Sequence, residues 1–168
     1  MKGTLKLEDG RELAVEIDEN ALKSVEEPKK KTGYERVDYY ERYYYEADDR
    51  VGSHVDGNDE ADHGFYNSAN YYSDESVARH NARADTLMRR LRRFAVEHRT
   101  KELDWNDSHE NKYYIAYDHD DKQLIDRANQ IYQSFGRIYF DSEETAKAAI
   151  EEFKDELIWY FTEYRNSL

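Results

Sequence analysis

The sequence contains no cysteine, a single proline and seven scattered glycines in 168 residues. The lack of cysteine excludes a disulfide framework, thiol catalysis and a cysteine-type zinc site, and it is typical of a reducing compartment. Apolar runs are short as well, and none approaches the roughly 18 residues that a membrane span needs. We therefore expect a cytoplasmic protein that contacts no membrane.

Positive charge is also scarce, because 25 Lys and Arg residues face 38 Asp and Glu residues and the formal net charge is −13. Nucleic acids and anionic membranes repel such a chain unless a local patch overrides the mean charge. The chain is nevertheless rich in aromatic residues, with 16 Tyr, 6 Phe and 2 Trp. This composition is too aromatic for a disordered acidic segment and predicts a folded domain.

The first segment shows the alternation of a β-hairpin, with apolar residues at every second position of Thr4–Ile17 on either side of a turn at Gly10. Pro28 lies in a stretch without periodicity and marks a linker. We therefore divide the chain into a hairpin unit (1–27), a linker (28–38) and two α+β segments (39–100 and 101–168).

The two α+β segments have the pattern of a diverged internal repeat. Tyr43–Tyr44 and Tyr113–Tyr114 are each followed by a second aromatic pair, Tyr71–Tyr72 or Tyr139–Phe140, which opens a helix. Each copy reads as two or three strands and a helix, a ββ(β)α unit. The predicted fold is α+β, with antiparallel strands packed against two long amphipathic helices and an additional N-terminal β-hairpin.

Local signals predict the ends of these elements. Ser73 is the expected N-cap of the first long helix, and Asp141 or Ser142 that of the second. Asp141 and Glu144 have the spacing of a capping box. The aromatic residues of 135–140 predict a strand that leads directly into the second helix.

Arginines concentrate on the first long helix, where residues 79–99 contain seven Arg against Asp85 and Glu97. Arg79, Arg83, Arg90 and Arg93 fall on one narrow arc at helical spacing. Such a stripe can grip phosphates or an acidic protein. Equally, these side chains can form a solvated face or pair with carboxylates of the same chain or of a second copy.

The acidic residues form three groups that we interpret as a partner-binding face. They are Asp48, Asp49, Asp56, Asp59, Glu60 and Asp62 in a first loop, Asp118, Asp120 and Asp121 in a second loop, and Glu151, Glu152, Asp155 and Glu156 on the last helix. Carboxylates repeated along rigid elements can imitate the phosphates of a nucleic acid and occupy a basic channel. The alternative is a charged face that keeps a tyrosine-rich domain soluble.

Signals for a catalytic or metal site are weak. The stretch from Asp56 begins like an EF-hand loop, but Ala61 replaces the turn glycine and Asn67 replaces the bidentate glutamate. No nucleophile, base and orienting partner occur in a known pattern. We expect no metal, no cofactor and no enzymatic activity.

The tyrosines of the first strand region are too numerous for one face of a strand to bury. They are Tyr39, Tyr40, Tyr43, Tyr44 and Tyr45. Since successive side chains point to opposite faces, some of them must contact solvent, a partner or another subunit. A homodimer is one of these alternatives.

The sequence resembles small uncharacterised proteins encoded by bacteriophages and prophages of Gram-positive bacteria. The similar stretches are Lys30–Val37, Tyr66–Ser73, Asn81–Asp85 and Ile138–Asp141 at the start of its helix. Phage accessory proteins of this size and acidity include anti-CRISPR proteins, which inhibit effector nucleases. The resemblance carries over no functional residue, because the family has no site that can be matched.

Our leading hypothesis is a phage-encoded inhibitor of the anti-CRISPR type in the cytoplasm of the infected bacterium. Its partner is a CRISPR effector nuclease or another defence protein that handles nucleic acid, bound through the acidic face. The alternatives are an accessory protein that binds nucleic acid through the arginine stripe, and a non-catalytic assembly protein that dimerises.

Overall fold

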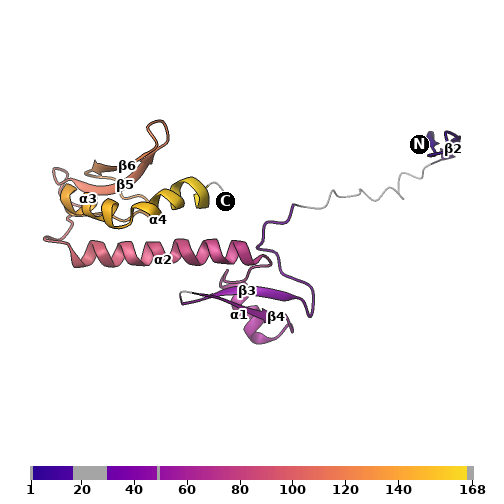
Figure 1. The fold of residues 1–168 in the computed structure, drawn as a ribbon, viewed down its shortest axis with the longest axis horizontal. Helices are drawn as coiled ribbons and strands as arrows, with labels where there is room; N and C mark the ends of the chain where they lie inside the picture. Colours follow the sequence, from indigo (N-terminus) through magenta and orange to yellow (C-terminus); the bar gives the residue numbers. More distant parts are fainter. Residues whose placement is uncertain (1, 17–29, 49, 166–168) are drawn as a thin grey trace. The chain divides into compact units, whose positions relative to one another are not determined.

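The computed structural model describes residues 2–16, 30–48 and 50–165 of the chain (Figure 1). It divides into two compact units, Met1–Thr32 and Gly33–Leu168, which are described separately. The fold is α+β, as the sequence predicts. The end of the predicted hairpin unit and the start of the predicted linker, residues 17–29, lie outside the described part of the chain.

The first unit contains the predicted β-hairpin. Strand β1 (Lys2–Lys6) pairs antiparallel with β2 (Glu12–Glu16), from Lys2 opposite Glu16 to Lys6 opposite Glu12. Gly10 adopts a φ of +84° in the turn, in the left-handed region that glycine adopts without steric cost. The backbone N–H of Arg11 donates to the Asp9 carboxylate and closes the turn.

The second unit begins with a hairpin and two helices. The hairpin consists of β3 (Arg42–Ala47) and β4 (Arg50–Val55), and the helices are α1 (Glu60–Asn67) and α2 (Glu75–Glu97). A second hairpin follows, formed by β5 (Lys112–Asp118) and β6 (Gln123–Asn129). The chain then forms α3 (Glu143–Glu152), α4 (Lys154–Trp159) and the π-helical turn η1 (Tyr160–Tyr164).

The same local arrangement occurs in both halves of this unit. The backbone groups of Tyr44 and Tyr72 exchange two hydrogen bonds of 2.9 Å, and those of Tyr113 and Phe140 exchange bonds of 3.0 and 2.8 Å. Each bridge lies two residues before the N-cap of the helix that follows. The bridges match Tyr44 with Tyr113, one residue away from the correspondence expected from the Tyr-Tyr pairs. Common descent of the two halves stays a prediction.

Two details of the second half differ from the sequence prediction. The expected strand at 135–140 is reduced to the single bridge at Phe140, because Gly136 has a φ of +73° and the preceding side chain of Phe135 is fully exposed. The second helix is not one long element, since Phe153 leaves helical geometry between α3 and α4. The ring of Phe153 is buried there, edge-on to Phe94 at 5.6 Å between centroids.

The N-cap of α2 differs from the predicted residue, whereas that of α3 agrees with the prediction. Asp74, not Ser73, caps α2, since its carboxylate accepts from the N–H groups of Ser76 and Val77. Ser73 is engaged elsewhere, where its N–H donates to the Gly33 carbonyl at 2.8 Å. Ser142 caps α3, which was one of the two expected residues.

The predicted capping box of Asp141 and Glu144 is wrong. Asp141 accepts hydrogen bonds from the backbone N–H groups of Thr100 and Lys101 and from the Thr100 hydroxyl. Its carboxylate therefore fixes the chain that leaves α2 and does not cap α3.

The long helix α2 is the element on which both halves pack. It contacts β3 and β4 of the first half and α3 and η1 of the second half (Figure 1). The α3–α4–η1 segment runs antiparallel to it, since Phe153 meets Phe94 and Tyr164 donates a hydrogen bond to Asn81. The main core cluster comprises Leu87, Leu91, Phe94, Phe140, Ala146, Ala149, Phe153 and Leu157. Every helix among the described residues is too short or too polar to cross a membrane.

A pair of phenylalanines tests this assignment of the core. Phe140 is buried in the cluster, whereas Phe135 is fully exposed five residues earlier. We expect Phe140→Ala to lower the free energy of unfolding by about 3–5 kcal/mol, since a large cavity forms in the core. Phe135→Ala should change it by less than about 0.5 kcal/mol. Urea denaturation followed by circular dichroism measures both, and equal losses would contradict the assignment.

Candidate functional site

The first acidic loop does not form a fully exposed surface. Asp56 and Asp62 are only 2% and 0% exposed, so neither belongs to a partner-binding face and both are removed from it. Asp48, Asp59 and Glu60 are exposed, and Asp49 lies outside the described residues. The sequence could not reveal this division, because the groups that bury the two aspartates come from distant segments.

Asp56 is held by an arginine that precedes the hairpin. The Arg36 guanidinium donates two hydrogen bonds to its carboxylate at 2.9 and 3.1 Å, and the Tyr71 hydroxyl donates a third at 2.8 Å. Arg36 therefore holds the pKa of the Asp56 carboxyl well below its usual range, although burial opposes this shift. Burial, followed by the hydrogen bond to Asp56, raises the pKa of Tyr71 to about 12.

Asp62 organises the loop and the start of α1. Its carboxylate accepts from the Tyr43 hydroxyl at 2.9 Å and from the N–H groups of Gly57 and Asp59 at 2.8 and 3.1 Å. Burial alone would raise the pKa of Asp62, but these hydrogen bonds hold it below its usual value. The rings of Tyr43 and Tyr71 stack at 4.1 Å between centroids, so the two carboxylates satisfy the hydroxyls of one stacked pair.

The same loop contains a group of side chains of the type that binds metals. Ligand atoms of His54, Asp59 and Asp62 lie within 4.8 Å of one another. Both oxygens of Asp62 already accept protein hydrogen bonds, and Asp59 accepts the N–H of Asp62 as the N-cap of α1. The loop geometry thus has its explanation in hydrogen bonds of the fold, and we assign no metal to it.

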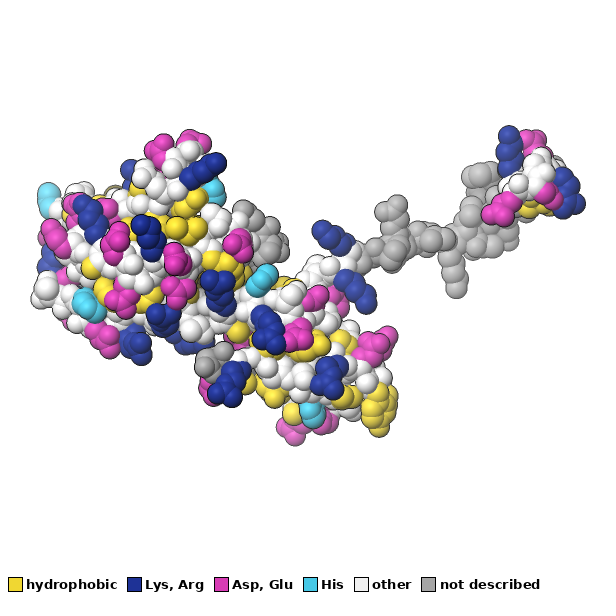
Figure 2. Space-filling view, in the orientation of Figure 1, with side chains coloured by type: hydrophobic (Ala, Val, Ile, Leu, Met, Phe, Trp, Pro, Cys, Tyr) yellow, Lys and Arg dark blue, Asp and Glu magenta, His cyan; other side chains and the backbone are white. Residues whose placement is uncertain are grey.

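Nine of the nominated acidic residues remain on the surface, and we call them the acidic surface: Asp48, Asp59, Glu60, Asp118, Asp120, Asp121, Glu151, Glu152 and Asp155. None of these side chains forms an ion pair with another described residue. The Asp118 carboxylate accepts the N–H groups of Asp120 and Asp121, so the β5–β6 turn is held in one conformation. Figure 2 shows acidic side chains at the tip of this hairpin, whereas acidic and basic groups are interspersed below it.

Glu156 differs from the other acidic residues on the last helix, because it pairs with the arginine stripe. Its carboxylate accepts a hydrogen bond from the Arg90 guanidinium at 2.7 Å. The Arg90 guanidinium also lies over the Phe153 ring at 4.9 Å. This pair joins α2 to α4 and is thereby a contact of the fold.

Two other arginines of the stripe are engaged within the chain as well. Arg79 pairs with Glu75 one turn earlier on α2, and the Arg83 guanidinium lies over the Trp159 ring at 3.8 Å. Arg93 is exposed. The expectation of pairing with the chain's own carboxylates is therefore confirmed for Arg79 and Arg90.

A groove of about 630 Å³ lies along this stripe between β4, α2 and α4. Arg50, Arg79, Arg83 and Arg90 line it, but so do Asp155 and Glu156. An anion in the groove would thus meet two carboxylates as well as guanidinium groups, which weakens its attraction.

The tyrosine-rich region is divided by burial. Tyr43 is fully buried, Tyr44 and Tyr45 are half-buried, and Tyr39 and Tyr40 are exposed and in edge contact with each other at 4.2 Å. A second exposed apolar group, Ile131, Tyr132 and Phe135, lies in the loop after β6. The sequence patterns placed Phe135 in a strand at 135–140 and predicted nothing for Ile131 and Tyr132.

Comparisons with known proteins give no relative: no protein-family model, no curated protein and no solved structure matches the chain.

The buried ion pair gives a prediction for pH dependence. Since the pKa of Asp56 is lowered in the folded state, its stabilisation is present above its unfolded pKa of about 3.9 and is lost as the pH falls toward the folded value. Asp56→Asn should cost about 1.5–3 kcal/mol at pH 7, because hydrogen bonds to a charged group are lost. The difference from wild type should shrink steadily below about pH 5.

Chemical denaturation across this pH range measures the effect. Asp120→Asn is the matched control, since Asp120 is exposed and its substitution should leave stability unchanged at every pH. A constant difference between wild type and Asp56→Asn from pH 7 to pH 2 would contradict the assignment.

Proposed function

We propose that the protein is a non-catalytic inhibitor of the anti-CRISPR type, encoded by a phage, which binds a host defence nuclease through the acidic surface. The observation that carries this proposal is the asymmetry of ion pairing. The side chains of the acidic surface have no cationic partner among the described residues, whereas Arg79, Arg83 and Arg90 of the stripe are paired or stacked within the fold and only Arg93 of the four is left. The charge left on these two surfaces is therefore mainly negative, and the complementary partner is basic.

The rigidity of the acidic groups supports the same proposal. Asp118, Asp120 and Asp121 are held by hydrogen bonds of the turn, and Glu151, Glu152 and Asp155 lie at the junction of α3 and α4. Carboxylates on ordered elements lose little conformational entropy when they bind. A basic channel that normally holds nucleic acid would then be occupied in competition with its substrate.

Binding to a purified CRISPR effector nuclease, free of nucleic acid, tests the proposal. We expect saturable binding that weakens at least about tenfold when salt rises from 0.1 to 0.5 M, because charge pairs at the rim of an interface are screened. The charge reversals D120K/D121K and E151K/E152K should each weaken binding further. E97K/E163K is the matched control, since it changes the net charge equally at exposed positions outside the acidic surface.

Binding that is indifferent to salt, or that survives both charge reversals, would overturn the proposal. A pull-down from host lysate with and without nuclease treatment identifies the alternative. Retained nucleic acid that is lost after Arg79, Arg83, Arg90 and Arg93 are changed to Glu would assign the function to the arginine stripe.

A further inference from the structure

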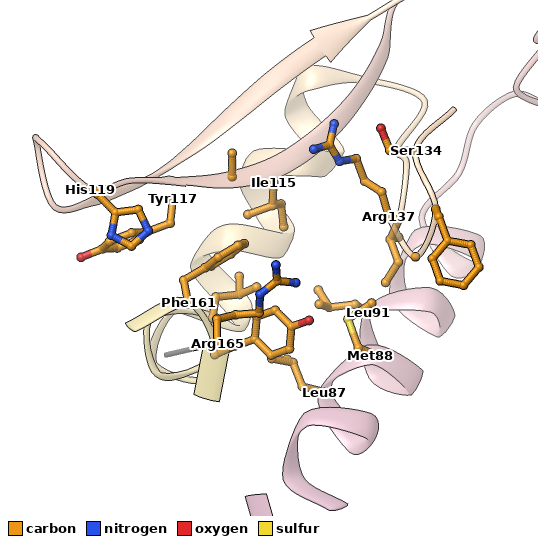
Figure 3. A pocket seen from close by; sticks show the side chains of 16 residues that line it. Leu87, Met88, Leu91, Ile115, Tyr117, His119, Ser134, Arg137, Phe161 and Arg165 are labelled. Carbon is orange, nitrogen blue, oxygen red and sulfur yellow. The ribbon is translucent and has the colours of Figure 1, made fainter. Parts of the chain in front are cut away.

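A second cavity of about 620 Å³ lies on the second unit and shares only Leu87 of its lining with the arginine groove. It is bounded by α2, β5, the 134–138 segment and the α4–η1 end of the chain (Figure 3). Its apolar wall includes Leu87, Leu91 and Leu157 of the buried core, together with Ile115 and Phe161. The volume lies within the range of about 300–1,000 Å³ that is typical of small-molecule sites.

The charge of this cavity is opposite to that of the chain. None of the Asp and Glu residues that the structure describes lines it, although the chain has 38 acidic residues. Its charged lining residues are Arg137 and Arg165, and His119 is a further titratable group. Figure 3 shows the guanidinium group of Arg165 extending toward Ile115 and Leu91, whereas that of Arg137 extends away from them toward the strand.

The two arginines are not neutralised by carboxylates of the described chain. The Arg137 guanidinium lies over the Tyr114 ring at 3.8 Å, which orients it without removing its charge. Neither Arg137 nor Arg165 forms an ion pair with any residue that the structure describes. Their donors are thus available to an anion, and a guanidinium fits a carboxylate in a two-point geometry.

We propose that this cavity binds a small amphipathic carboxylate, whose apolar body packs on Leu87, Leu91 and Ile115 and whose carboxylate meets Arg165, while Arg137 adds positive charge to the lining without a direct contact. The combination of an apolar wall with two unpaired cations selects this class. An uncharged apolar molecule would leave the guanidinium groups without a partner, and a small hydrophilic anion would leave the apolar wall unfilled. The proposal is independent of the acidic surface, since none of those residues lines the cavity.

Decanoate and decanol form a matched pair of probes, because they share an alkyl chain and differ in the anionic group. We expect the full-length protein to bind one decanoate, measured by calorimetry below the concentration at which micelles form. Decanol should bind at least about tenfold more weakly, since it makes no charge-assisted hydrogen bond.

Substitutions test the charged part and the apolar part of the cavity separately. Arg165→Gln should weaken decanoate binding about tenfold, Arg137→Gln should weaken it by less, and both should leave decanol binding unchanged. Arg92→Gln is the matched control, because it removes an exposed positive charge outside the lining and should change neither. Phe135→Ala should weaken both probes, since Phe135 lines the cavity and its exposed side chain is not needed for folding.

Three results would overturn the proposal. They are the absence of saturable decanoate binding by a folded protein, equal affinity for decanoate and decanol, and equal losses for Arg92→Gln and Arg165→Gln. In the last two cases the cavity would be a general apolar surface and its arginines would not select an anion.

Discussion

A two-stranded hairpin is marginally stable in water, and both hairpins of the Gly33–Leu168 unit depend on helices. The β3–β4 hairpin packs on α2, whereas the β5–β6 hairpin packs on α3 and α4, and α3 packs on α2. Ala78, Ala82 and Ala84 are buried in the first part of α2, and Leu87, Leu91 and Phe94 belong to the main core cluster with residues of α3 and α4. The shape of this unit follows from α2 serving two cores in succession.

The packing around α2 also determines which charged side chains are paired or buried within the fold. Arginines on the sides of α2 lie next to α4, where Arg90 reaches Glu156 and Arg83 reaches Trp159. In the first half, three tyrosine hydroxyls donate to carboxylates, from Tyr43 to Asp62, from Tyr71 to Asp56 and from Tyr72 to Glu46. Some acidic residues are thus part of the core, and the acidic surface consists of the remainder. Part of the net charge of −13 therefore belongs to buried, hydrogen-bonded carboxylates, and the remainder lies on the surface.

Sequence patterns predicted what depends on neighbours along the chain. The hairpins, the α+β class, the amphipathic character of α2 and the cap at Ser142 all follow from periodicity and turn residues. The sequence patterns failed where a residue far away in the sequence determines whether a side chain is buried or caps a helix. Asp56 is buried because Arg36 and Tyr71 converge on it, and Ser73 is not a cap because its hydroxyl donates to the Glu35 carboxylate.

The candidate sites show the same division. Positions on one arc of α2 correctly grouped the arginines that line a common groove, but only the fold shows that Asp155 and Glu156 share it. The apolar cavity has no sequence signature, since its lining combines α2, β5 and the C-terminal helices. Residues from such separate segments meet only after folding.

The central claim is that the acidic surface is the part of this protein that meets a basic partner. Hydrogen–deuterium exchange of the full-length chain, free and bound to a CRISPR effector nuclease, tests it most directly because it locates the contact without a substitution. The account predicts slower exchange in the β5–β6 turn at 118–123 and at the α3–α4 junction at 151–156. Slower exchange confined to residues 79–93 of α2, with neither acidic segment affected, would contradict it.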